Sequence, residues 1–157
     1  MKIGLYIDVS NLYYCLYNNM KGKLNYSGLL DFFEPLGSII IRKAYGAQLK
    51  DEAKTFIAIL EKLGFEAIYK EPKYYAKGGG AYTNGKADWD VGIAVDCIKD
   101  MSKVDAYILG TADGDMSPLV KYLIEDGKTV IIFGNNISKE LREVATKAIE
   151  IPASLLI

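Results

Sequence analysis

The chain has 157 residues, half of them apolar and a quarter charged, with a formal net charge of -1. This size and composition are typical of one globular domain with a sizeable core, so we expect a single domain over residues 1–157. The nearly neutral charge excludes a global basic field for coating nucleic acid, so any contact with nucleic acid has to come from a local patch.

The chain contains no histidine and only two cysteines, Cys15 and Cys97. Without histidine, Ser-His-Asp catalysis, Cys-His catalysis and histidine-liganded zinc are excluded. Two cysteines make neither a disulfide framework nor a zinc site, so we expect free thiols in a reducing compartment. The first apolar run is too short for a signal peptide, and no run reaches the roughly 18 apolar residues of a membrane span. We therefore expect a cytoplasmic protein without membrane contact, whose chemistry uses carboxylates, hydroxyls, amines or a metal held by oxygen.

Stretches with strand character alternate with stretches of helical period along the chain. Ser10 is the expected N-cap of the first helix, with Asn11 in the first turn. This alternation favours an α/β fold in which helices cover both faces of a mostly parallel sheet of five to six strands. The expected strands are 2–7, 39–45, 65–69, 104–109, 129–133 and 147–151. The expected helices are 10–18, 26–33, 51–63, 87–99, 117–124 and 138–145.

Residues 72–85 form the longest stretch without a regular period, and loops of this length are usually functional or mobile. Tyrosines alternate here with lysines and three glycines, which is typical of a surface that stacks bases and contacts phosphates. The alternative is a loop whose tyrosines pack back on the domain. The expected substrate-binding residues are Lys73, Tyr74, Tyr75, Lys77, Tyr82 and Lys86, with Arg42 and Lys43 near the end of the second strand. Ordinary solvated charges are the alternative for the basic residues.

Acidic residues follow two of the expected strands at their carboxyl ends. Asp8 ends the first strand, and Asp113 and Asp115 follow the fourth strand after Thr111. In parallel sheets, ligands bind outside the carboxyl ends where the strand order reverses. If the first and fourth strands are neighbours there, these acids converge, and Asp90 can reach them from the first turn of its helix. Two like charges about 5 Å apart repel by roughly 3 kcal/mol at an effective dielectric near 20, so the cluster requires protons or a cation.

Each of these acids also has a structural explanation. Asp8 is placed to cap the following helix, and the two acids after the fourth strand are placed to form a turn. Asp90 is favoured at the positive end of its helix in any case. Asp96 lies about 120° around that helix from Asp90, so we expect it to be structural or to support the site from outside. Asp88 is left unassigned.

Three segments, 7–11, 85–96 and 111–119, resemble in order and spacing the signature motifs of NYN domains, which are PIN-like nuclease domains. The resemblance spans nearly the whole chain, and the LabA-like branch is the most similar. It implies a PIN-like three-layer α/β/α sandwich with strand order 3-2-1-4-5 and an acidic site for Mg²⁺ or Mn²⁺. Met116 and Ala112 depart from the larger apolar residue and the glycine that the family usually has.

The resemblance also implies which residues form the site. Asp8, Asp90 and Asp113 match the metal-binding acids, and Asp115 matches a further acid of the site. The polar residues that orient ligands or the attacking water are Asn11 and Thr111. The implied function is a metal-dependent ribonuclease that hydrolyses phosphodiester bonds of single-stranded RNA, with RNA favoured over DNA as the partner.

Three other functions compete with this one. A catalytically silent module that binds nucleic acid or protein has the same fold. A haloacid-dehalogenase-like phosphatase needs an acid two residues after the nucleophilic aspartate, where this chain has Ser10. A phosphoacceptor receiver domain needs an aspartate after the third strand, where this chain has Tyr69, Lys70 and Glu71. A homodimer is left open, because the apolar tail 153–157 covers either the core or a partner.

Overall fold

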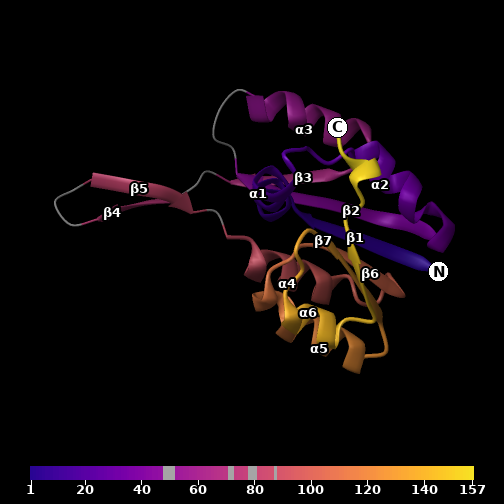
Figure 1. Cartoon of the computed structure of the whole chain (residues 1–157). Helices are drawn as coiled ribbons and strands as arrows, with labels where there is room; N and C mark the ends of the chain where they lie inside the picture. The colour runs from indigo at the N-terminus through magenta and orange to yellow at the C-terminus, as the bar shows by residue number, and fades with distance from the viewer. Residues whose placement is uncertain (48–51, 71–72, 78–80, 87) are drawn as a thin grey trace.

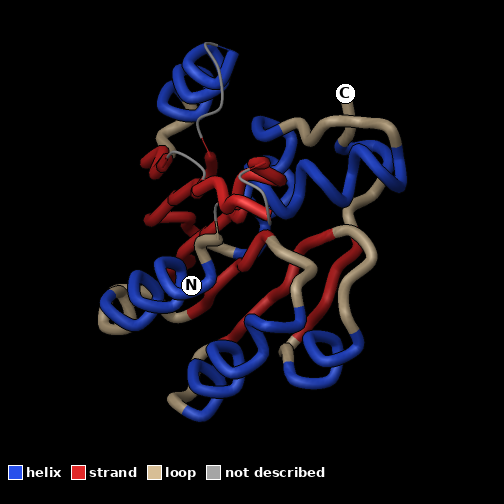
Figure 2. Tube along the Cα trace, turned by 90° about the vertical axis from the view of Figure 1, so that its left-hand side faces the viewer, coloured by secondary structure: helices blue, strands red, loops and turns tan. Residues whose placement is uncertain are grey.

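The centre of the molecule is a six-stranded sheet in which every neighbouring pair of strands is parallel (Figures 1 and 2). The computed structural model describes residues 1–47, 52–70, 73–77, 81–86 and 88–157. The strand order is β3-β2-β1-β6-β7-β8, so the predicted order is confirmed, with a sixth strand at the edge. The strands are β1 (Lys2–Asp8), β2 (Ser38–Ala47), β3 (Glu66–Lys70), β6 (Ala106–Gly110), β7 (Thr129–Gly134) and β8 (Lys147–Glu150).

Helices cover both faces of this sheet, which confirms the three-layer arrangement (Figure 2). One face packs against α1 (Val9–Met20), α2 (Tyr26–Phe33) and α3 (Glu52–Lys62). The other face packs against α4 (Asp90–Lys99), α5 (Ser117–Glu125) and α6 (Lys139–Val144). Among the described residues, no helix is both long enough and apolar enough to cross a bilayer.

Alternation along β1 explains why the sheet has a core on each side. Ile3, Leu5 and Ile7 pack in the first core, whereas Tyr6 packs in the second. Successive side chains of a strand point to opposite faces, so a central strand that is covered twice is apolar throughout. The tail belongs to the first core, because Leu155 is buried there.

The second core encloses a polar network that joins the sheet to α4. The Tyr6 hydroxyl donates to Asp100 Oδ2 at 2.7 Å, and the Tyr45 hydroxyl donates to Asp96 Oδ2 at 2.6 Å. The Lys43 ammonium lies 3.4 Å from Asp100 and 3.9 Å from Asp96. Asp96 therefore helps to hold α4 on the sheet, in agreement with its predicted structural role.

Two predicted helix starts differ from the structure. Asp8 caps α1 in place of Ser10, because the Asp8 carboxylate accepts a hydrogen bond from the backbone N–H of Asn11. The fourth helix begins at Asp90 rather than at residue 87, which lies outside the described residues. The first difference places an acid of the predicted site directly at the junction of β1 and α1.

The prediction of an irregular stretch over 72–85 is wrong, because this part of the chain contains a β-hairpin. Strands β4 (Lys73–Lys77) and β5 (Ala81–Lys86) pair antiparallel and project away from the sheet (Figure 1). Tyrosine and threonine favour strands, and a short glycine-rich connection favours pairing of neighbouring strands. The hairpin lies away from the two cores, so its strands do not need the apolar alternation by which a half-buried strand is predicted.

Candidate metal centre

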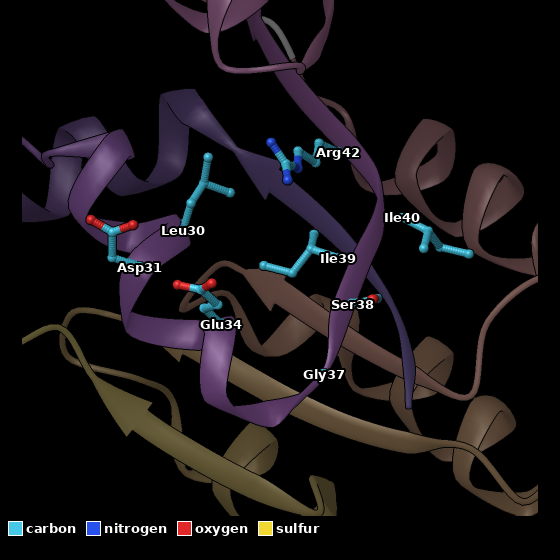
Figure 3. A pocket seen from close by; sticks show the side chains of 8 residues that line it. All are labelled: Leu30, Asp31, Glu34, Gly37, Ser38, Ile39, Ile40 and Arg42. Atoms are coloured by element: carbon cyan, nitrogen blue, oxygen red, sulfur yellow. The ribbon is translucent and has the colours of Figure 1, made fainter.

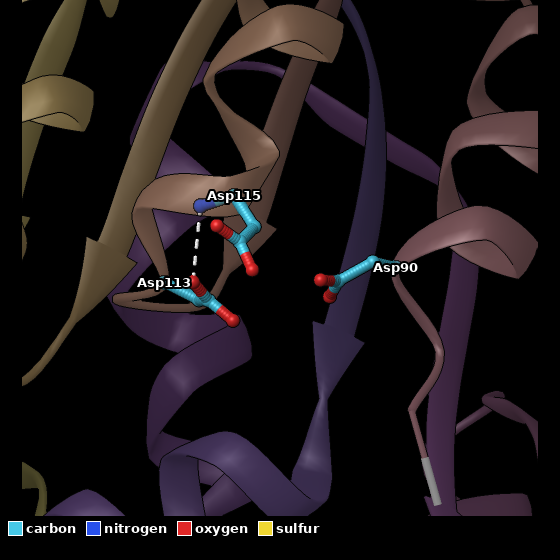
Figure 4. A group of neighbouring side chains, drawn as sticks. All are labelled: Asp90, Asp113 and Asp115. Atoms are coloured by element: carbon cyan, nitrogen blue, oxygen red, sulfur yellow. Dashed lines mark hydrogen bonds between the residues drawn. The ribbon is translucent and has the colours of Figure 1, made fainter.

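Three carboxylates meet at the carboxyl end of the sheet. Asp90 is the first residue of α4, Asp113 precedes the short 3-10 helix η2 (Gly114–Met116), and Asp115 lies within η2. One carboxylate oxygen from each lies within 4.8 Å of the others. Figure 4 shows Asp90 facing the other two across a small gap. Because β1 and β6 are neighbours, the end of β1, which carries Asp8, adjoins the turn with Asp113 and Asp115, whereas the group of three joins this turn to the start of α4.

The turn that carries two of these acids is held by hydrogen bonds on both sides. Thr111 is 2% exposed, and its hydroxyl accepts from the backbone N–H of Asp113 at 3.2 Å. The Asp113 carboxylate accepts in turn from the N–H of Asp115 at 3.0 Å (Figure 4). The Asn11 side chain accepts from the N–H of Ala112 at 3.0 Å. These contacts support a positioning role for Thr111 and Asn11, because each oxygen is engaged by the backbone of the turn.

Asp8 lies beside this group of three and is not one of its members. Its Oδ1 accepts from the Asn11 N–H at 3.1 Å, so this oxygen is used to cap α1. The residue is only 8% exposed. Burial, together with the charges of Asp88 and Asp113, raises the pKa of Asp8 from 3.8 to about 6. Asp8 is therefore close enough to interact with the cluster electrostatically, at the edge nearest to α1.

The pKa of Asp90 is raised further, from 3.8 to about 7. Burial is the largest cause, and the charges of Asp88, Asp113, Asp8 and Asp115 add to it. Burial and mutual repulsion therefore disfavour the fully ionised form of the cluster near neutral pH. A divalent cation relieves this repulsion, and an all-oxygen donor set suits the hard cations Mg²⁺ and Mn²⁺. The residues present thus fit such an ion.

Asp88 belongs to this electrostatic group, although the sequence patterns did not indicate it. Its carboxylate is exposed and accepts from the backbone N–H of Asp90 at 2.8 Å. Its charge contributes to the raised pKa values of both Asp8 and Asp90. The sequence signal for this role is the spacing Asp-Trp-Asp before a helix, because an aspartate side chain often accepts a hydrogen bond from the backbone N–H two residues later.

Arg42 and Lys43 lie away from the acids, in the middle of β2. The Lys43 ammonium is paired with Asp96 and Asp100 on one face of the sheet. The Arg42 guanidinium donates to the Leu63 carbonyl at 2.7 Å on the other face. It also lines a hollow between α2 and the start of β2 (Figure 3). Because β2 continues to residue 47, these two residues do not mark its end, and their contact with phosphates stays a prediction.

The other predicted substrate contacts lie on the hairpin. The side chains of Lys73, Tyr74, Tyr75, Lys77, Tyr82 and Lys86 lie outside the described residues, so these contacts stay predictions. Lys70, which was not predicted, brings a cation to this region. Its ammonium lies 4.2 Å from the centre of the Trp89 ring and donates a hydrogen bond to the Asp88 carbonyl. Both of these residues directly precede Asp90 in the sequence.

Comparison with known proteins agrees with this fold. The chain is similar to a protein of unknown function from Vibrio parahaemolyticus that is known from a crystal structure. The two are 30% identical with a TM-score of 0.87, over 99% of this chain and 96% of that one. No curated protein matches the chain significantly. The family model described as NYN domain matches residues 2–152, which include all the acids of the cluster. The chain therefore belongs to the NYN domain family.

Proposed function

We propose that this chain is a divalent-metal-dependent nuclease that hydrolyses phosphodiester bonds of single-stranded RNA. The observation that carries the proposal is the approach of three carboxylates to within 4.8 Å, between the start of α4 and the turn after β6, in a member of a PIN-like nuclease family. The ordered motifs at 7–11, 85–96 and 111–119 support the LabA-like branch. One sheet with a core on each face supports a single domain.

In this proposal Asp90, Asp113 and Asp115 hold Mg²⁺ or Mn²⁺, and Asp8 lies beside them. The bound ion supplies Lewis acidity for activating water and positive charge for the phosphate in the transition state. Asn11 and Thr111 hold the turn, so that the carboxylates do not have to be reorganised when substrate binds.

The same acids would repel a polyanion, so the substrate also needs positive charge nearby. Lys70 brings one cation to the edge of the cluster. The lysines of the hairpin, Lys73, Lys77 and Lys86, are predicted to supply more. A charged edge around an acidic centre would let phosphates approach while the acids hold the cation.

The test is a cleavage assay with single-stranded RNA, double-stranded RNA and single-stranded DNA, each with Mn²⁺, Mg²⁺ or EDTA. We expect cleavage of single-stranded RNA that requires the metal and falls at least about a hundredfold in Asp113→Asn. Asparagine keeps the oxygen that caps η2, so this change removes charge with little effect on the turn.

Asp126→Asn is the matched control, because it makes the same chemical change at the exposed far end of α5. It should cleave as the unaltered protein does. Full cleavage by Asp113→Asn would exclude the proposed metal centre. Binding of RNA without cleavage under every metal condition would favour the catalytically silent module instead.

A further inference from the structure

The outer side of α1 carries three exposed tyrosines. Leu12 and Leu16 are buried in the first core, and Tyr14 lies about 160° from both around the helix axis. Tyr14 is 70% exposed, and Tyr13 and Tyr17 are exposed as well. The face of α1 opposite the core is therefore aromatic where a surface helix usually carries charged side chains.

These rings already form a stacked arrangement with a cation beside it. The ring centres of Tyr13 and Tyr17 are 6.1 Å apart, with an angle of 16° between the planes. The Lys21 ammonium lies 5.1 Å from the centre of the Tyr17 ring. Residues 9–20 include no aspartate or glutamate, and Lys21 and Lys23 follow directly. A polyanion that approaches this face meets aromatic rings and cations, and no carboxylate of α1.

The helix that carries this aromatic face begins beside the acidic cluster. α1 begins at the residue after Asp8, so its first turn lies at the cluster. Cys15 lies on another side of α1 than Tyr13 and Tyr17, and there burial raises the pKa of its thiol, with the charges of Asp8 and Asp113 raising it further. In Figure 1, α1 lies at the end of the sheet from which the β4–β5 hairpin projects.

We propose that Tyr13, Tyr14 and Tyr17 form a platform on which bases of single-stranded RNA stack while the backbone passes the acidic cluster. The choice of RNA as the occupant rests on the proposed nuclease function. Flat hydroxylated rings beside lysines suit bases and phosphates, because every base has an aromatic face and every phosphate is an anion. The platform would hold the strand in register with the carboxylates and so favour unpaired over paired RNA.

The test measures binding of a fluorescently labelled single-stranded RNA by anisotropy, with Ca²⁺ present to neutralise the carboxylates. We compare the unaltered protein with the triple variant Tyr13→Ala, Tyr14→Ala, Tyr17→Ala. Stacking of one base on an aromatic ring is worth about fivefold or more in affinity, so the triple variant should bind at least tenfold more weakly. A strand of equal length that lacks its bases should bind the two proteins equally.

Tyr122→Ala is the matched control, because Tyr122 is an exposed tyrosine on α5. It should bind RNA as the unaltered protein does, and circular dichroism should show that the triple variant is folded. The triple Tyr→Phe variant keeps the rings and should retain the affinity.

Equal affinity of the unaltered protein and the triple alanine variant would overturn the platform, as would no detectable binding by the unaltered protein. A dimer that the triple variant dissolves, with RNA affinity unchanged, would assign this face to a second copy of the chain and also overturn it. These outcomes are separate from failure of the nuclease proposal, because binding is measured without cleavage. Cleavage by both proteins at equal rates and equal affinity would leave the nuclease intact and remove only the platform.

Discussion

The side-chain oxygen of Asn11 accepts a hydrogen bond from the backbone N–H of Ala112 at 3.0 Å, across 101 positions of the sequence. This contact joins the first turn of α1 to the turn that carries Asp113 and Asp115. It ties the two strand ends together from outside the sheet. The resemblance to the family implies that Asn11 orients a ligand or water, and this role stays a prediction.

Asn11→Ala should therefore weaken metal binding without removing a metal ligand. Loss of the hydrogen bond costs roughly 1 kcal/mol and leaves the Ala112 N–H without this partner. We expect several-fold weaker Mn²⁺ binding by isothermal titration calorimetry. Asn18→Ala, an exposed change on the same helix, should leave binding unchanged. Unaltered Mn²⁺ affinity in Asn11→Ala would show that the turn keeps its conformation without this hydrogen bond.

Gly134→Ala should disturb the same turn from the other side. A Cβ at this position, the last residue of β7, would lie 2.6 Å from the backbone oxygen of Thr111. The backbone at residue 134 or at Thr111 would have to move to relieve this contact. We therefore expect a loss of about 1–3 kcal/mol in the free energy of unfolding and weaker Mn²⁺ binding. Urea denaturation and calorimetry measure the two effects. Loss of stability with intact metal affinity would show that the strain relaxes away from Asp113.

The metal-free protein should become less stable as the pH rises from 5 to 8. Asp8 and Asp90 have pKa values near 6 and 7, above the ordinary 3.8, so the folded state retains protons that the unfolded chain has already released. The free energy of unfolding then falls with pH across this window, by roughly 1–3 kcal/mol for the buried Asp8. Urea denaturation in EDTA at several pH values measures this slope.

Asp90→Asn should flatten that slope and raise the stability at pH 8, whereas Asp126→Asn should leave the slope unchanged. Saturating Mn²⁺ should raise the stability most at pH 8, because the ion competes with the protons. A metal-free protein that is equally stable at pH 5 and pH 8 would contradict the raised pKa values.

Tyr6→Phe should destabilise the fold without affecting the metal centre. The Tyr6 hydroxyl donates to the buried carboxylate of Asp100, which also lies 3.4 Å from Lys43. Burial raises the pKa of Asp100, but the Tyr6 hydrogen bond and the Lys43 charge outweigh this and lower it overall. Removing the hydroxyl leaves the carboxylate poorly satisfied, at a cost of about 1–3 kcal/mol.

The lowered pKa of Asp100 also sets the sign of the pH dependence. Its stabilising contribution is present above the ordinary value of 3.8 and is lost as the pH falls through the folded value. The difference between Tyr6→Phe and the unaltered protein should therefore be largest near neutral pH and smaller in acid. Tyr122→Phe, at an exposed position, should change the urea midpoint little.

The predicted elements of the sheet agree with the structure because both of its cores depend on local apolar patterns. The alternation in β1 and the helical period of α5 each require a covered face, so their positions follow from the order of residues. The hairpin β4–β5 was missed because it projects from the sheet. No apolar period was needed to form it, and pairing between the two strands decided its structure instead.

The sequence by itself determined the α/β class, the six strands of the sheet and the acids that follow β1 and β6, because these depend on periods and spacings along the chain. Only the tertiary structure decided which side chains meet. It grouped Asp90 with Asp113 and Asp115, used an oxygen of Asp8 to cap α1, and paired Lys43 with Asp96 and Asp100. The physical reason is that these contacts join elements far apart in sequence, and depend on strand order and on the face to which each strand residue points.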